Sequence, residues 1–212
     1  VTQGALAAAT AGVNIFDSAI NYRGQRGERA LADALRQLFL TGRAKREEVF
    51  ISTKGGFVPL EGDASEEEKA VFLREYVEKG VVAAGELVAD CHCMHPAYLE
   101  NQLERSRRNL QLETIDLYYI HNPETQLEEY PERLFYERLH DAFTFLEKAR
   151  ADGRIGAYGL ATWEGFRQIP DSPGHLDLKK VLSVARSAAP AGGDCGFKAI
   201  QMPFNLVMLE AG

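Results

Sequence analysis

Short apolar segments alternate with longer amphipathic segments along the chain. The short segments are rich in β-branched and aromatic residues, as buried strands are. They predict five strands, at residues 13–16, 48–53, 115–120, 155–161 and 197–201. Between them, apolar residues recur at helical spacing and predict helices at residues 2–11, 28–40, 66–79, 96–110, 132–151 and 176–188. This alternation indicates an α/β fold with a parallel sheet.

Local signals mark some helix ends and core positions. Pro96 suits the first position of its helix, where a missing N–H costs nothing. Ser65 and Glu68 have the spacing of a capping box, which predicts a helix start near residue 66. Phe143 and Phe145 are expected to pack in the core.

Each predicted strand ends on a polar residue or is followed by one. These residues are Asp17, Lys54, His121, Thr162 and Gln201. In a closed β/α barrel, the carboxyl ends of all strands face one mouth, and catalysis takes place there. We therefore predict that the five residues form one site.

The composition limits the class of protein. The chain has 212 residues, 45% of them hydrophobic, which is enough for a single domain over residues 1–212. Its net charge of −7 disfavours binding to nucleic acids or to membrane surfaces. The three cysteines indicate a reduced, cytoplasmic protein without a disulfide framework. No apolar run approaches the roughly 18 residues that span a bilayer.

The strand ends carry groups suited to proton transfer. Asp17 and Lys54 have opposite charges on neighbouring strands and are expected to pair. Tyr22 lies on the loop after Asp17, and a nearby ammonium would lower the pKa of its phenol by stabilising phenolate. Such a tyrosine can donate a proton to a developing alkoxide, while His121 orients the carbonyl group.

Side chains cannot supply a hydride, so a reduced nicotinamide is the expected partner of these groups. Thr162 and Gln201 are candidates to hydrogen-bond its carboxamide. No G-x-G-x-x-G motif follows a predicted strand, which disfavours a Rossmann unit in an open doubly wound sheet, the alternative architecture.

The cluster Cys91-His92-Cys93-Met94-His95 raises the question of a metal site. Its C-x-C spacing differs from the C-x2–4-C pairs of structural zinc sites, and the sequence has no second pair. We interpret the cluster as a cysteine-containing loop and predict no metal. Trp163, Phe57 and Tyr98 are candidates to line a substrate pocket, or simply to pack.

Five motifs resemble the aldo-keto reductase family in order and spacing over essentially the whole chain. They are IFDSAINY at 15–22, VFISTK at 49–54, TIDLYYIHNP at 114–123, GRIGAYGLAT at 153–162 and AIQMPFNL at 199–206. The resemblance implies a (β/α)8 TIM barrel. It also implies reduction of aldehydes or ketones with NADPH or NADH, and a small carbonyl compound as substrate.

The resemblance assigns roles to individual residues. The catalytic tetrad of the family falls on Asp17, Tyr22, Lys54 and His121. Tyr22 would be the general acid. The carboxamide contacts fall on Gln201 and on Thr162, although many members have Ser-Asn where this chain has Ala161-Thr162.

The sequence departs from the family in two further ways. A barrel of eight strand–helix units needs about 250 residues, so we expect the first strand and the last two units to be absent from this sequence. The phosphate contacts of the family lie mostly in those last units, so the choice between NADPH and NADH cannot be inferred. Residues 55–97 are interpreted as a long insertion after the strand that bears Lys54.

Two alternative functions stay open at this point. The barrel could be a non-enzymatic or regulatory subunit that binds nicotinamide. It could also be a Schiff-base lyase that uses Lys54 as its nucleophile. The presence of Asp17 and Tyr22 near Lys54 disfavours this second alternative. The physiological substrate and the oligomeric state are not determined by the sequence.

Overall fold

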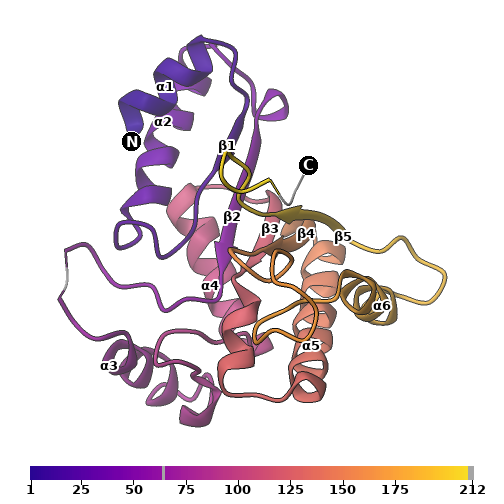
Figure 1. The fold of residues 1–212 in the computed structure, drawn as a ribbon. Helices are drawn as coiled ribbons and strands as arrows, with labels where there is room; N and C mark the ends of the chain where they lie inside the picture. The colour runs from indigo at the N-terminus through magenta and orange to yellow at the C-terminus, as the bar shows by residue number, and fades with distance from the viewer. Residues whose placement is uncertain (64, 210–212) are drawn as a thin grey trace.

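The computed structural model describes residues 1–63 and 65–209, and its centre is one parallel sheet with helices packed against it (Figure 1). The strands are β1 (Ile15–Asp17), β2 (Phe50–Gly55), β3 (Ile115–His121), β4 (Ile155–Ala161) and β5 (Phe197–Gln201). They pair in the order β1-β2-β3-β4-β5. A doubly wound sheet reverses its order at a switch point, whereas consecutive order is that of a barrel wall. The alternative architecture is therefore wrong.

All the predicted helices are present; their ends shift by at most two residues except in α3, which is much shorter than predicted. They are α1 (Thr2–Thr10), α2 (Arg26–Leu40), α3 (Glu68–Phe72), α4 (Pro96–Leu110), α5 (Glu132–Ala151) and α6 (Leu178–Ala188). Pro96 is indeed the first residue of α4.

The predicted capping box is wrong. The chain is still extended at Glu67, which precedes α3, so Ser65 lies too far from the first turn to cap it. The helix then widens into a π-helical turn over Leu73–Val77, which ends before the predicted residue 79.

The first two strands begin and end later than predicted. The register pairs Asp17 with Ser52, so Asp17 is the last residue of β1 and Lys54 lies within β2. Side chains alternate along a strand, so Ser52 and Lys54 share one face of β2 while Thr53 points to the opposite face.

The main core lies between the sheet and its helices. Leu31 and Leu35 of α2 are buried there, together with Leu99 of α4. Phe143 and Phe145 of α5 are buried in the same cluster, as predicted. Burying a side chain of this size contributes about 1.5–3 kcal/mol, which is why these faces fix the helices on the sheet.

A buried carboxylate ties β2 to two helices behind the site. Glu28 of α2 accepts hydrogen bonds from Thr53 Oγ1 at 2.7 Å and from Asn109 Nδ2 at 2.8 Å. Burial raises the pKa of Glu28, and the hydrogen bonds oppose that shift only in part. The network sets the strand position from which Lys54 projects.

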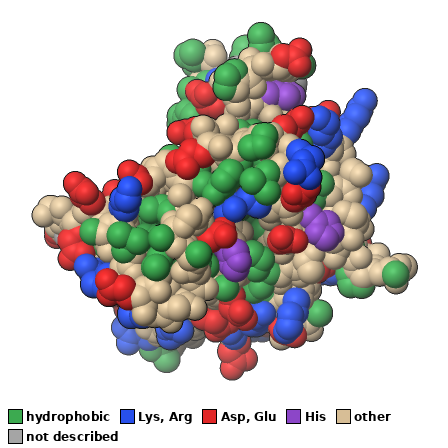
Figure 2. Space-filling view, turned by 90° about the horizontal axis from the view of Figure 1, so that it is seen from below, with side chains coloured by type: hydrophobic (Ala, Val, Ile, Leu, Met, Phe, Trp, Pro, Cys, Tyr) green, Lys and Arg blue, Asp and Glu red, His purple; other side chains and the backbone are tan. Residues whose placement is uncertain are grey.

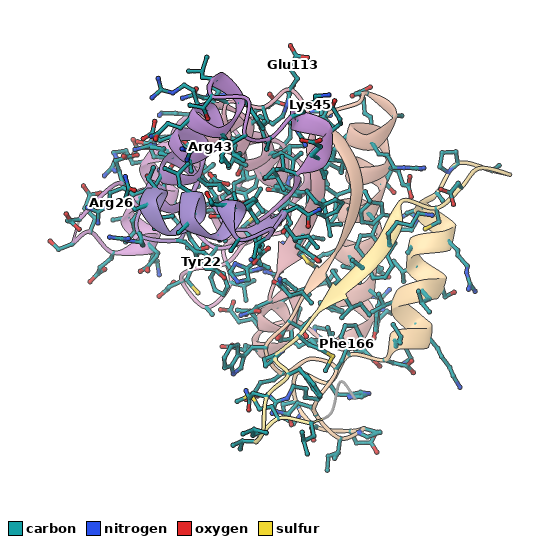
Figure 3. The ribbon with its side chains drawn as sticks, turned by 90° about the horizontal axis from the view of Figure 1, so that it is seen from above. Tyr22, Arg26, Arg43, Lys45, Glu113 and Phe166 are labelled. Atoms are coloured by element: carbon teal, nitrogen blue, oxygen red, sulfur yellow. The ribbon has the colours of Figure 1, made fainter. Side chains whose placement is uncertain are left out.

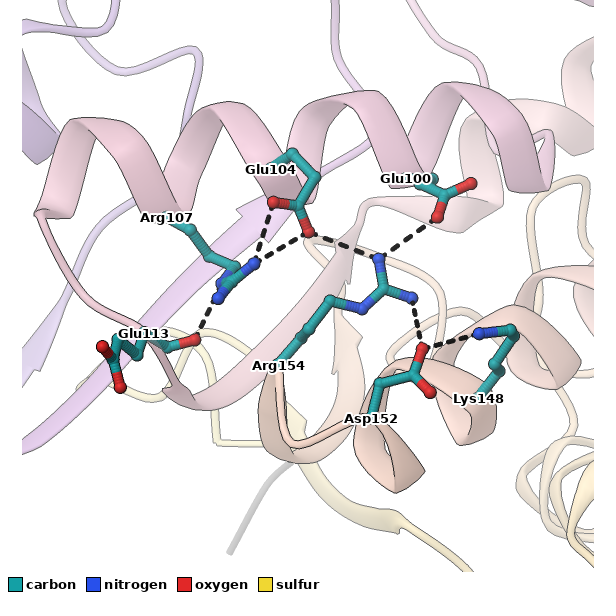
Figure 4. Close-up of polar contacts among 7 residues, drawn as sticks. All are labelled: Glu100, Glu104, Arg107, Glu113, Lys148, Asp152 and Arg154. Atoms are coloured by element: carbon teal, nitrogen blue, oxygen red, sulfur yellow. Dashed lines mark hydrogen bonds and ion pairs between the residues drawn. The ribbon is translucent and has the colours of Figure 1, made fainter.

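Polar contacts at the amino ends of the strands join α4 to the turn before β4 (Figure 4). Arg154 donates to Glu100, Glu104 and Asp152 at 3.2–3.3 Å. In β/α barrels this end serves stability, and catalysis takes place at the opposite end.

The chain between β2 and α4, residues 56–95, contains its own buried cluster with the start of α4. The buried residues of that cluster are Val58, Val71, Phe72, Tyr76, Val82, Cys93 and Tyr98. Because Tyr98 is fully buried there, its candidacy as a pocket wall is wrong. In Figure 1 this β2–α4 segment, with α3, lies away from the sheet on the side of α2 and α4.

The surface is mixed in charge. On the face drawn in Figure 2, acidic side chains are interspersed with basic ones around hydrophobic side chains. Within residues 1–63 and 65–209, no helix combines the length and the apolar character that crossing a bilayer requires.

Candidate active site

Lys54 lies at the centre of the site as a buried ammonium. Its Nζ donates to Asp17 Oδ2 at 2.5 Å and to the carbonyl of Ser18 at 2.7 Å, and its side chain is only 2% exposed. Ser52 Oγ donates to the other oxygen of Asp17 at 2.6 Å. Burial lowers the pKa of Lys54, and the charge of Asp17 opposes that shift.

Tyr22 lies on the loop between β1 and α2, and its ring covers the ammonium. Lys54 Nζ is 5.0 Å from the centroid of the ring, a cation–π contact. The loop is fixed at both ends, since Ile20 N–H donates to the carbonyl of Lys54 and Gly27 N–H donates to that of Tyr22, each at 3.2 Å. Tyr22 is 41% exposed, so it can meet a molecule from solution.

The predicted lowering of the Tyr22 pKa is wrong. Burial raises the pKa of Tyr22, and the negative charge of Asp17 adds to the increase. Lys54 faces the ring, and its charge is already paired with Asp17. Tyr22 therefore stays protonated at neutral pH, the state that a proton donor needs.

His121 ends β3 and faces the same space. Its ring centroid lies 5.7 Å from that of Tyr22, with the rings nearly perpendicular. Burial lowers the pKa of His121 to about 3, and the nearby Lys54 contributes in the same direction. The imidazole is therefore neutral at physiological pH, with one nitrogen as donor and one as acceptor.

Thr162 and Gln201 lie side by side at the ends of β4 and β5. Thr162 N–H donates to the carbonyl of Gln201 at 2.8 Å. Thr162 Oγ1 is buried and has no hydrogen-bond partner within the described part of the chain. A hydroxyl and a side-chain amide at neighbouring strand ends are the kinds of group that can pair with the carboxamide of nicotinamide, which has both donors and an acceptor.

The β2–α4 segment contacts the loop that carries Tyr22 through backbone atoms. Gly62 N–H donates to the carbonyl of Gly24 at 3.0 Å. A Cβ atom at Gly24 would lie 2.2 Å from the oxygen of Gly62, so this approach requires glycine. Gln25 reinforces the contact by donating to the carbonyl of Leu60 at 3.2 Å.

Ion pairs surround this backbone contact. Arg26 pairs with Asp63, and Arg29 pairs with Glu61. Figure 3 labels Tyr22, on the loop before α2, and Arg26, the first residue of α2. Exposed pairs of this kind contribute little each, so we ascribe the fixed loop position mainly to the glycine contact.

We expect Gly24→Ala to destabilise the protein by about 1–3 kcal/mol more than Gly42→Ala, as overpacking does. The two glycines have similar backbone angles, with φ of +58° and +66°, but a Cβ atom at Gly42 meets nothing within 4 Å. The difference in free energy of unfolding, measured in urea, therefore isolates the contact with Gly62. Equal losses in the two variants would show that the contact contributes nothing.

The model of the Aldo/keto reductase family matches residues 4–190. The chain belongs to this family. The family fold is the (β/α)8 barrel, so the predicted fold class and family are both confirmed.

Among solved structures, a glycerol dehydrogenase from Gluconobacter oxydans has the same fold. It is 22% identical to this chain with a TM-score of 0.56, and the match covers 97% of this chain and 45% of that chain. The chain thus spans less than half the length of that structure. None of the curated proteins compared with the sequence matches it.

The cluster at residues 91–95 does not form a set of metal ligands. Burial raises the pKa of Cys91 to about 11 and that of Cys93 to about 12, so both thiols stay protonated. His92 uses both ring nitrogens in hydrogen bonds to other residues. Within the described ranges, no three His, Cys, Asp or Glu residues lie close enough to hold a metal ion.

The structure also adds residues that the sequence analysis missed. Ser52 could have been found, because it shares the face of Lys54 two residues away and lies opposite Asp17. His92 could not have been found from the sequence, because only the folding of the β2–α4 segment brings it next to His121. Of the pocket candidates, Phe57 contacts the His121 ring, with a 5.1 Å centroid separation, whereas Trp163 is exposed beyond β4.

Proposed function

We propose that the protein reduces a small aldehyde or ketone to an alcohol with NADPH or NADH. The observation that supports this most is the convergence of Tyr22, Lys54 and His121 around one space at the carboxyl end of the sheet. The family consists of oxidoreductases that act on carbonyl compounds, and the chain carries the groups that such a reaction needs.

When bound, the reduced nicotinamide supplies the hydride to the carbonyl carbon. Tyr22 Oη donates its proton to the oxygen as negative charge develops there. The Lys54 ammonium stabilises the phenolate that this transfer leaves, and Asp17 holds the ammonium in place. His121, neutral and able to donate one hydrogen bond, orients the carbonyl oxygen.

The residues proposed to hold the cofactor are Thr162 and Gln201. Their adjacent positions at the ends of β4 and β5 support a role in carboxamide binding. A cytoplasmic location remains a prediction from the three free cysteines.

The decisive experiment follows the absorbance of the reduced cofactor in the full-length protein as small aldehydes and ketones are added. We expect cofactor oxidation matched by an equal amount of alcohol. Tight binding of cofactor without turnover on any carbonyl compound would instead support a regulatory subunit.

One observation favours the Schiff-base alternative, because a lysine with a lowered pKa is a better nucleophile. The same nitrogen, however, is engaged by Asp17 and by the carbonyl of Ser18. Borohydride treatment with a carbonyl substrate separates the two cases. A covalent adduct on Lys54 would contradict the reductase proposal, and we expect none.

A further inference from the structure

His92 is a buried histidine that the proposed chemistry does not use. It lies near the end of the β2–α4 segment and is 0% exposed. Antiparallel bridges pair it with Phe57 and with Val88, and the neighbouring Cys93 N–H donates to the carbonyl of Gly56 at 3.0 Å. The backbone that carries the ring is therefore fixed, in part by contacts to the chain that follows Lys54.

The hydrogen bonds of His92 determine which ring nitrogen carries the proton. Nε2 lies 2.8 Å from the carbonyl oxygen of His121, which can only accept, so Nε2 must donate. Gln126 Nε2 lies 2.9 Å from Nδ1, the acceptor of the neutral ring. Burial lowers the pKa of His92 to about 4, which keeps the ring neutral and this tautomer in place.

The bond from His92 acts where the chain leaves the sheet. His121 is the last residue of β3, and Asn122 follows with a left-handed φ of 44°. The Asn122 N–H donates to the carbonyl of Ala161 at 2.6 Å. The peptide group after His121 is thus held on one side by His92 and on the other by β4.

Packing around the two histidines is close. The Phe57 ring lies edge-on to both, with centroid separations of 5.1 Å from His92 and 5.1 Å from His121. A Cβ atom at Gly56 would lie 2.6 Å from His92 Nε2 and 3.1 Å from the carbonyl oxygen of His121. The glycine therefore lets the hydrogen bond form.

We propose that His92 is a positioning residue for His121, contributed by the β2–α4 segment. The inference rests on the proposed reductase function, in which His121 orients the carbonyl oxygen. His92 does not touch the reacting atoms. Its Nε2–H fixes the peptide group of His121, and that peptide group, together with Phe57, sets the direction of the imidazole.

The test compares His92→Phe, which keeps a ring but removes both nitrogens, with His92→Gln, whose amide can still donate to the carbonyl of His121. We expect His92→Phe to lower kcat about 10- to 100-fold, because small misplacements of reacting groups cost that much. KM and cofactor affinity should change much less, and His92→Gln should recover most of the lost kcat. His140→Phe, at a partly exposed histidine of α5, is the matched control and should behave like the parent.

A second measurement does not depend on turnover. Imidazole ¹⁵N shifts should show His92 protonated at Nε2 in the parent, and the signals of His121 should move in His92→Phe but not in His140→Phe. If His92→Phe does not fold, Gln126→Leu tests the same role, because it removes the hydrogen bond to Nδ1 that holds the His92 ring against the carbonyl of His121. It should lower kcat and shift the His121 signals in the same direction.

Unchanged kcat in a folded His92→Phe protein would overturn the proposal. So would His121 signals that do not move, or a His92→Gln protein no more active than His92→Phe. If the parent reduced no carbonyl compound, the proposed function would fail on its own, and the His121 signals would still decide whether His92 positions that residue.

Discussion

Replacing Tyr22 by phenylalanine is expected to lower kcat for carbonyl reduction by about 10²–10⁴-fold, the usual contribution of general acid catalysis. The hydroxyl is the proposed proton donor, and its raised pKa keeps it protonated at neutral pH. In the parent, Lys54 Nζ lies 5.0 Å from the centroid of the Tyr22 ring, and a phenylalanine ring can keep this contact. The site should therefore keep its shape, and cofactor affinity should stay nearly unchanged.

Steady-state rates and cofactor titrations on the same preparations measure both quantities. Tyr130→Phe is a suitable control, because the Tyr130 hydroxyl donates only to the carbonyl of Gly85, outside the site. A Tyr22→Phe protein that turns over within about threefold of the parent would rule out Tyr22 as the general acid.

Lys54→Met is expected to lower kcat by about 10²–10³-fold, the cost of losing one preorganised group that stabilises developing charge. It should also change the dependence on pH. The parent needs Lys54 as an ammonium. Its rate is therefore highest at pH values below the pKa of Lys54 and falls as the pH rises through that pKa. Burial lowers this pKa from its usual value.

In Lys54→Met the next group to lose its proton is Tyr22, whose pKa is already raised by burial and by Asp17. The unpaired Asp17 charge raises it further. The alkaline limb of the pH–rate profile should therefore move to higher pH while the rate at neutral pH drops. An alkaline limb at the same pH in parent and variant would contradict this role, and Lys179→Met, on the exposed face of α6, provides the control.

The pairing of Asp17 with Lys54 could be predicted from the sequence because it depends on local patterns. Apolar runs predicted the strands, and polar residues at their ends predicted one mouth, where Lys54 and Asp17 do pair. The assignment of the catalytic and cofactor-binding roles remains a prediction. Fold class followed from the alternation of strands and helices, and consecutive strand order excludes the doubly wound sheet.

Other properties could not be predicted, because they depend on burial and on contacts distant in sequence. The direction of the Tyr22 pKa shift depends on how deeply the ring is buried and on which partner holds the charge of Lys54. The bond from His92 to His121 joins residues 29 positions apart. The capping box failed because a four-residue pattern does not determine where an extended chain turns into α3.

The contact between Gly24 and Gly62 has a consequence for how this protein can diverge. It is made by main-chain atoms alone, so it does not depend on the identity of any neighbouring side chain. Exposed residues near it, such as Glu61 and Asp63, can be exchanged in evolution without moving Tyr22, provided that both glycines stay. Exposed positions of this segment can therefore vary while the loop that carries Tyr22 keeps its place.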